Sequence, residues 1–210
     1  MKILSLNIGQ PKEIIWQGRS VLTGIFKYPT ADRTAVYPPG INGDGQADPV
    51  YHGGIDKAVY AYAREHYAYW EEMLPAYPFE PANFGENLTT EGMLDADVRI
   101  GDEFRTGSVV LRATQPRFPC AKLGLRFGDA SMVTRFKKAR RHGIYFRVIE
   151  PGAVRAGDTI ELVKASACGI TVQNVVDAFY EPERHSDVVE SILAISEFPV
   201  LLRQHFAKFA

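Results

Sequence analysis

The sequence predicts a mainly β protein with inserted helices, in which a barrel-like β domain over residues 1–165 is followed by a three-helix segment over residues 166–210. Short apolar stretches separated by glycine and proline continue as far as Val163, which is typical of strands joined by turns. Helical spacing of apolar side chains is confined there to two stretches, and it takes over after about residue 166. The 210 residues, 46% of them hydrophobic, suffice for one sizeable core.

The N-terminal part is predicted to consist of strands and one long loop. Residues 3–8 have the apolar pattern of a strand, residues 13–21 that of its partner in a hairpin, and residues 24–27 that of a further strand. Residues 37–45 contain too much proline and glycine for regular structure. Residues 59–62 alternate as a buried strand does, so we expect this strand to anchor the loop before it.

The middle of the chain is predicted to combine helices with a hairpin. A helix is expected over residues 64–74, where Tyr67 and Trp70 fall on one face that packs in the core. Residues 98–114 have the pattern of a hairpin. An aspartate precedes a helical pattern over residues 130–141, whose last turn is basic.

The last third begins with strands and ends with helices. A strand over residues 143–149 and a hairpin over residues 154–163 complete the β domain. Three helices are then expected, beginning at Thr171, at a capping box over residues 187–190, and at Pro199. They are too short to bury a large core alone, so we expect them to dock on the barrel or on a second subunit.

Composition excludes several classes of protein. A net charge of −1 lacks the global basic field of a nucleic-acid partner, and no apolar run approaches the length of a membrane span. The first residues turn polar too soon for a secretory signal, so a cytoplasmic location is expected. Cys120 and Cys168 are too few for a disulfide framework, an all-cysteine zinc site or an iron–sulfur cluster.

The stretch around Cys120 is the strongest candidate for chemistry. Prolines follow Gln115 and Phe118, hold both residues in extended conformations, and stiffen the backbone that presents the thiol. Arg117 and Lys122 flank the thiol with positive charge, which favours the thiolate that attacks or binds metal. The alternative is that Cys120 is a small buried hydrophobic residue.

Two further loops carry polar residues beside glycine. In the first, Gly53 and Gly54 allow the backbone to approach a ligand closely, with His52, Asp56 and Lys57 around them. The alternative for this loop is an ordinary turn whose polar side chains face water. In the second loop, the Asn87 amide is suited equally to a hydrogen bond with a ligand and to capping its own turn.

Together these loops resemble the MOSC domain family, named for the C-terminal part of molybdenum-cofactor sulfurases, and most closely its stand-alone YiiM-like branch. The resemblance rests on HGGxDKAV from His52, GENL from Gly85, IGDxF from Ile100 and QPRxPCxKL from Gln115, followed by three helices. It covers nearly the whole chain. Each motif is weak by itself, but the combination is specific.

The resemblance implies a β-rich, barrel-like domain that binds the molybdenum cofactor, or molybdopterin, with Cys120 as the protein ligand of the metal. A soft thiolate suits such a metal. The anionic end of the cofactor would contact four cations and two glycine amides, and two amide side chains would read the edges of its ring. These residues are Lys57, Arg64, Arg117 and Lys122, then Gly53 and Gly54, then Asn87 and Gln115.

The resemblance also implies an oxidoreductase that reduces small N-hydroxylated substrates, such as hydroxylaminopurines, to amines. His52 is the expected proton donor, with Asp56 as its orienting partner, beside the catalytic Cys120. Electrons would come from a separate electron-donor reductase, because the sequence has no visible flavin or haem motif. Larger family members carry an additional N-terminal domain, so here the C-terminal helices or a homodimer partner would complete the pocket.

Three other functions stay open at this point. Cys120 with His52 as base fits a thiol hydrolase or transferase. A protein of this kind also fits a non-catalytic carrier of the cofactor or of sulfur. The third is nucleic-acid binding by the basic helix end and the C-terminal helices, against which the near-neutral charge argues.

Overall fold

An eight-stranded, mostly antiparallel sheet forms the centre of the molecule. The structure, a computed structural model, describes residues 1–48 and 53–210. The strands follow the order β13-β9-β10-β11-β7-β8-β1-β4, and only β7 and β8 are paired in parallel. Their bounds are Lys2–Ile8 (β1), Tyr28–Thr30 (β4), Val59–Ala63 (β7), Leu88–Glu91 (β8), Glu103–Thr106 (β9), Val109–Pro116 (β10), Ile144–Glu150 (β11) and Ile160–Lys164 (β13). The mainly β fold with helices is thus confirmed.

The sheet is not closed into a barrel, which corrects that part of the expected architecture. β1 pairs with both β8 and β4. The segment that leads into β13 therefore forms hydrogen bonds only with the beginning of β1. There the Ile3 N–H donates to the Asp158 carbonyl over 3.0 Å, and the Ile160 N–H donates to the Met1 carbonyl over 2.8 Å. The sheet therefore curls until its two ends meet at one point, without forming a continuous ladder between them.

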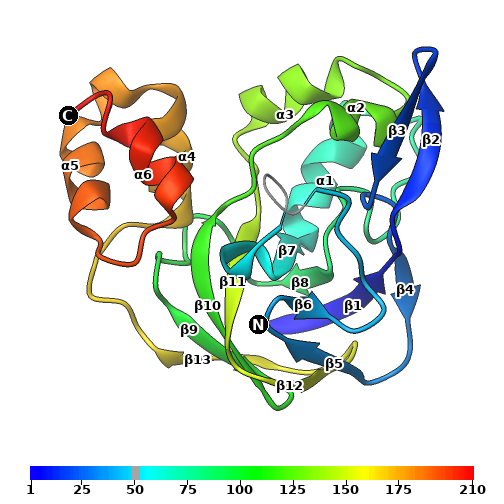
Figure 1. Cartoon of the computed structure of the whole chain (residues 1–210), viewed down its shortest axis with the longest axis horizontal. Helices are drawn as coiled ribbons and strands as arrows, with labels where there is room; N and C mark the ends of the chain where they lie inside the picture. The colour runs from blue at the N-terminus through cyan, green and yellow to red at the C-terminus, as the bar shows by residue number, and fades with distance from the viewer. Residues whose placement is uncertain (49–52) are drawn as a thin grey trace.

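Short strands extend the sheet at its margins. β2 (Lys12–Trp16) and β3 (Arg19–Thr23) form a hairpin with each other, which projects from the body of the molecule (Figure 1). The expected pairing of residues 13–21 with residues 3–8 is wrong, because β1 pairs with β4 and β8 instead. Residues 24–27 are not a strand, because they turn back toward the pocket described below. The expected hairpin over residues 154–163 is also wrong, because its two arms pair elsewhere. β12 (Gly152–Val154) pairs with β5 (Thr34–Tyr37), which also pairs with β6 (Gly40–Ile41), and β13 pairs with β9.

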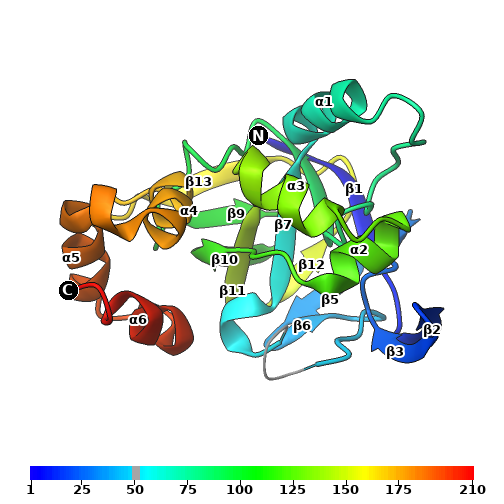
Figure 2. The ribbon, with the colours of Figure 1, turned by 90° about the horizontal axis from the view of Figure 1, so that it is seen from above.

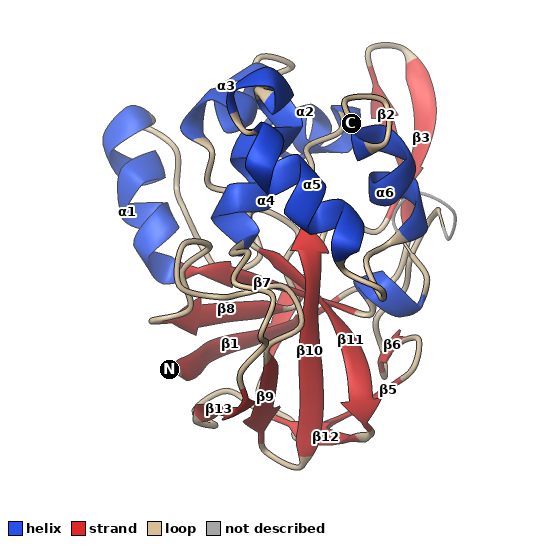
Figure 3. Ribbon diagram, turned by 90° about the vertical axis from the view of Figure 1, so that its left-hand side faces the viewer, coloured by secondary structure: helices blue, strands red, loops and turns tan. Residues whose placement is uncertain are grey.

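Three helices cover one end of the sheet (Figure 3). They are α1 (Arg64–Met73), α2 (Ala121–Phe127) and α3 (Met132–Ala139). An aromatic cluster lies beneath them, and within it Trp70 stacks on Phe136 with ring centroids 5.9 Å apart. The core role expected for Tyr67 and Trp70 is confirmed, because both are almost fully buried. The sequence did not predict α2, although this helix begins directly after Cys120.

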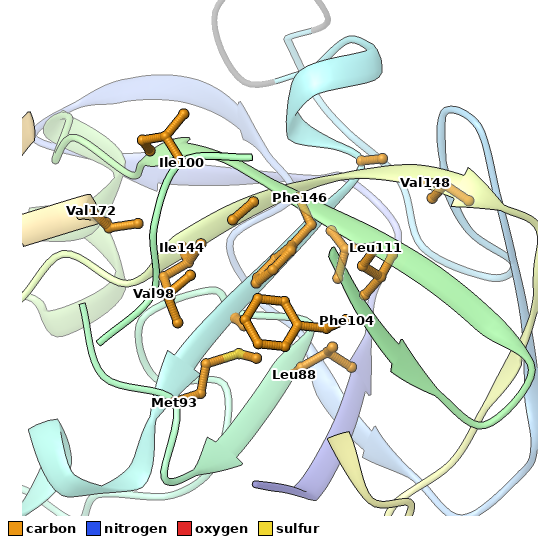
Figure 4. Packing of buried hydrophobic residues seen from close by; sticks show 14 of the residues in the cluster. Leu88, Met93, Val98, Ile100, Phe104, Leu111, Ile144, Phe146, Val148 and Val172 are labelled. Carbon is orange, nitrogen blue, oxygen red and sulfur yellow. The ribbon is translucent and has the colours of Figure 1, made fainter. Parts of the chain in front are cut away.

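The C-terminal segment forms a group of three helices at one side of the molecule (Figures 1 and 2). They are α4 (Val172–Tyr180), α5 (Ser186–Ala194) and α6 (Val200–Phe206), with the 3-10 turn η2 (Pro182–Arg184) between the first two. Their buried side chains belong to the same apolar cluster as those of the sheet. Figure 4 shows Val172 of α4 beside Val98 and Ile100, so the segment shares the core of the β domain.

The helix starts were predicted with mixed success. Thr171 caps α4 as expected, because its side chain accepts from the Asn174 N–H while the Asn174 side chain accepts from the Thr171 N–H. No side chain caps α5, so the capping box expected over residues 187–190 is wrong, and the N-cap position falls two residues earlier, at His185. Among the described residues, no helix combines the length and apolar character needed to cross a bilayer.

We expect Thr171→Ala to lower the free energy of unfolding by about 1 kcal/mol, because it removes the reciprocal cap at the junction of the sheet and the C-terminal helices. Chemical denaturation followed by circular dichroism measures this change. Ser186→Ala at the start of α5, where no side-chain cap is made, is the matched control and should change the value by less than about 0.5 kcal/mol. Equal effects of the two variants would contradict the role of the cap.

Candidate functional site

Cys120 lies where β10 passes into α2. The strand ends at Pro116, three residues connect it to the cysteine, and Cys120 occupies the position before the first residue of the helix with an extended backbone. Its carbonyl accepts from the Leu123 N–H over 2.9 Å, which closes the first turn. The thiol is only partly buried and lines an open pocket, so the expected presentation of this side chain is seen in the structure.

Arg117 is the buried cation of this connection. Its guanidinium lies between the rings of Tyr60 and Phe136, 5.5 Å from each centroid, and the side chain is 6% exposed. Its Nη1 has no hydrogen-bond partner in the described structure, although it is fully buried. Buried donors are rarely left unpartnered, and Arg117 is one of the residues that line the pocket, so its guanidinium is a candidate donor to a ligand oxygen.

A buried carboxylate that the sequence did not single out holds Arg117 in place. Asp95 accepts from the backbone N–H groups of His142 and Gly143 over 2.8 and 3.0 Å, and it contacts His66 Nε2 at 3.1 Å. His142 in turn donates from Nδ1 to the Arg117 carbonyl over 2.8 Å. No local motif announces Asp95, because its partners are distant in sequence.

Electrostatics fix the protonation of these groups. Burial acts to raise the pKa of Asp95, but hydrogen bonding from His66 and the backbone outweighs it and holds the pKa below its usual value. Burial lowers the pKa of His142 to about 4, despite its hydrogen bond to the Arg117 carbonyl. Burial would lower the pKa of Arg117 too, but nearby Tyr60, Tyr145 and Cys120 raise it, so this side chain stays charged.

The pocket beside Cys120, which we call the cation pocket, gathers four basic side chains. Its empty space, including the part open to solvent, is about 590 Å³. The basic residues are Lys27, Lys57, Arg117 and Lys122, and the remaining walls come from residues 23–25 and 44–47 and from Phe84, Gly85, Asn87, Tyr60 and Tyr145. Asp44 is the acidic residue among these described lining residues, so the pocket is net positive.

Close backbone packing shapes the walls of the cation pocket. A Cβ on Gly24 would lie 2.6 Å from the Gly45 carbonyl oxygen, and one on Gly85, whose φ is +78°, would lie 2.8 Å from Ile25 Cγ1. Asp44 joins these loops through its ion pair with Lys27, in which both side chains are buried. The lining loops therefore need glycine here, which the sequence had suggested for Gly53 and Gly54 instead.

Five of the predicted cofactor-binding residues come together in the cation pocket. They are Lys57, Asn87, Arg117, Cys120 and Lys122. The Asn87 amide is already used within the fold, since its Oδ1 accepts from the Tyr60 N–H and its Nδ2 donates to Asn7 and Asp44. It therefore fixes the pocket wall, and its hydrogen bonds favour the turn-holding alternative.

The structure does not bring the other predicted residues into this pocket. Gln115 lines a neighbouring pocket, and Arg64 lies on α1, where it pairs with Glu71 at 2.7 Å. Gly53 and Gly54 are absent from the described walls of both pockets. The Asp56 carboxylate accepts from Arg147 Nε and Nη2 over 2.9 and 2.6 Å. His52 lies outside the described residues, so its expected pairing with Asp56 stays a prediction.

Tyr145 and Lys57 are candidate proton donors, because both line the cation pocket and its neighbour together with Cys120. Burial raises the pKa of Tyr145, partly offset by the charge of Arg117, so the phenol keeps its proton. Burial lowers the pKa of Lys57, partly offset by Asp56 and Asp48. The sequence had suggested Lys57 but not Tyr145.

Comparison with known proteins places these features in a family. The MOSC domain matches residues 48–161. An uncharacterized protein, YflK of Bacillus subtilis strain 168, is 41% identical over 98% of this chain and 93% of its own. A protein named reductase from Gibberella moniliformis is 34% identical over 75% of this chain, which corresponds to 28% of that longer protein.

A solved structure shows the same fold along the whole chain. The crystal structure of YiiM from Geobacillus stearothermophilus superimposes with a TM-score of 0.83 and 30% sequence identity, covering 99% of this chain and 98% of that one. The similarity therefore includes the C-terminal helices as well as the sheet. It agrees with the branch that the sequence motifs indicated.

We expect the free energy of unfolding to fall on acidification from pH 7 to pH 5 because of His142. Its pKa is about 4 in the folded protein and near 6.5 when unfolded, so the unfolded state takes up the proton first. This difference removes about 2 kcal/mol of stability over that interval. Denaturant titrations at each pH measure it, and His142→Gln should flatten the dependence; an equally steep dependence in the variant would refute the assignment.

Proposed function

Because the chain belongs to the MOSC domain family, we propose that this MOSC-type oxidoreductase binds the molybdenum cofactor in the cation pocket and reduces N-hydroxylated compounds to amines. The observation that carries the proposal is the position of Cys120 at the edge of a net positive pocket that also contains the unpartnered Arg117 Nη1. A relative named reductase supports redox chemistry in this family.

The residues present fit such a cofactor. Within residues 1–48 and 53–210 there is no group of three or more His, Cys, Asp or Glu side chains that could hold a metal ion alone. A single thiolate is enough for a metal that brings other ligands with it, as molybdenum does in its pterin cofactor, and sulfur suits molybdenum. Arg117, Lys122 and Lys27 would bind the phosphate end of the cofactor.

The proposed reaction is R–NHOH + 2 e⁻ + 2 H⁺ → R–NH₂ + H₂O. The N–O bond breaks, nitrogen is reduced, and the oxygen leaves as water. The bound cofactor would supply the two-electron step, and a separate electron-donor reductase would supply the electrons. The protein would orient the substrate and hold the protons. Lys57 and Tyr145 carry protons beside Cys120, while His52 stays a further predicted donor.

We expect Cys120→Ala to lower the molybdenum and pterin content by about tenfold or more, because the protein ligand of the metal is lost. Protein purified from a molybdenum-replete host is analysed by elemental analysis and pterin fluorescence. Turnover of an N-hydroxylated compound with an artificial electron donor is measured on the same samples. Cys168→Ala is the matched control and should keep both the cofactor content and the turnover of wild type. The Cys168 thiol contacts the Ile100 carbonyl, away from the pocket.

The outcomes of this experiment separate the proposal from its alternatives. Metal and pterin without turnover of any N-hydroxylated compound would indicate a carrier. Thiol-dependent hydrolysis or group transfer by metal-free protein would indicate a thiol enzyme. Wild-type protein that binds neither molybdenum nor pterin in a replete host would refute the proposal.

We expect Arg117→Gln to lower the amount of bound cofactor by about tenfold or more, because the charge-assisted hydrogen bonds from Arg117 to the anionic end of the cofactor are lost. The molybdenum and pterin content of each variant is measured by the same elemental and pterin analyses. Lys122→Gln keeps the test valid where loss of the buried Arg117 impairs folding, and it should show a smaller loss in the same direction. Arg135→Gln on the exposed face of α3 is the control, and an equal loss in it would contradict the role of Arg117.

A further inference from the structure

A second pocket meets the cation pocket at Cys120. Lys57, Cys120 and Tyr145 line both. The second pocket, which we call the helix-side pocket, extends toward α6 and holds about 800 Å³ up to its open mouth. Its other walls come from Asp48, from the end of β10 and the segment after it, and from Leu201 and Leu202 of α6.

The two pockets differ in chemistry. Phosphate needs several cations, and three of the four basic side chains of the cation pocket are absent from the described walls of its neighbour. The helix-side pocket instead presents mainly apolar surface, from Pro116, Phe118, Leu201 and Leu202. A flat, weakly polar ring suits such walls better than an anion does. The thiol that separates the pockets would face a cofactor on one side and a substrate on the other.

Gln115 is one of the polar residues that line the helix-side pocket, together with Asp48, Lys57, Cys120 and Tyr145. The Gln115 side chain is 4% exposed, and its Nε2 is buried without a hydrogen-bond partner in the described structure. The residue lies opposite Tyr145 in the pairing of β10 with β11, so the rigid sheet fixes both. An unpartnered amide donor at the wall of an open pocket points to an acceptor atom of a ligand.

We propose that the helix-side pocket is the substrate subsite, in which a planar heteroaromatic ring packs against Phe118, Leu201 and Leu202 and accepts a hydrogen bond from Gln115 Nε2. This inference rests on the proposed function, which requires the N–OH group of the substrate to point at Cys120. Gln115, which the sequence suggested as a contact of the cofactor ring, is thereby reassigned as a residue that determines substrate specificity. Acyclic N-hydroxylated compounds lack the ring and the acceptor atom that it carries, so they gain little from this pocket.

The C-terminal helices would therefore take part in substrate selection. Ion pairs hold their α5–α6 loop on the sheet, since Glu197 pairs with Arg112 and lies 3.9 Å from Arg147. Arg147 also pairs with Asp56 at 2.6 Å, which connects this loop to the turn that carries Lys57. These contacts fix the position of α6 relative to Cys120, as a substrate wall requires.

Two variants on different elements test the subsite. Gln115→Leu removes the donor at nearly constant volume, and Leu201→Ser removes apolar surface from a side chain that is 54% exposed. Gln204→Ala, on the exposed part of α6, is the control. The probes are adenine, whose dissociation constant is measured by calorimetry, and 6-hydroxylaminopurine and acetamidoxime, whose KM values are measured with an artificial electron donor. Molybdenum content is measured throughout.

We expect Gln115→Leu to weaken adenine binding and raise the KM for 6-hydroxylaminopurine by about tenfold, with a smaller change in the same direction for Leu201→Ser. The KM for acetamidoxime and the molybdenum content should stay within about twofold of wild type. Unchanged adenine binding and KM in both variants, with metal and turnover intact, would overturn the subsite and leave the proposed function standing. If wild-type protein binds adenine, Gln115→Leu weakens that binding, and wild type has neither metal nor turnover, only the proposed function would be overturned.

Discussion

The buried guanidinium of Arg117 is the constraint on which the site depends. A permanent charge that is 6% exposed is costly unless something compensates it, and here the compensation comes from two aromatic faces and nearby ionisable groups. The backbone beneath it is fixed by His142, whose own turn is held by Asp95. The sheet and α3 thus hold one cation ready for an anion, and they fix the segment that leads to Cys120.

Cys120 is important because of its position at the end of the segment that contains Arg117. It stands at the boundary of two pockets of different character, one cationic and one largely apolar. In the proposed reaction, that separation would let a charged cofactor and a weakly polar substrate each bind the surface that suits it. The C-terminal helices supply one wall of the apolar side and share the core with the sheet, so a single folding unit builds both surfaces.

Local patterns were sufficient for many elements of the fold. Alternation placed β1, β7 and β11, and apolar spacing placed α1 and α4, because these signals depend on residues close together in the chain. The short α2 was missed, since its seven residues carry too little periodicity. Closure of the sheet was misjudged, because the pairing of β1 with both β8 and β4 is a relation between distant segments.

The sequence by itself determined the mainly β class, the family motifs and the prominence of Cys120, Arg117, Lys57 and Lys122, because proline, glycine and charge act on their immediate neighbours. Only the tertiary structure decided which polar residues share a pocket. It moved Gln115 to the side of α6, left Arg64 on α1, and brought in Asp95, Lys27 and Tyr145. Side chains far apart in sequence converge only when strands pair and helices pack, and no local pattern encodes that geometry.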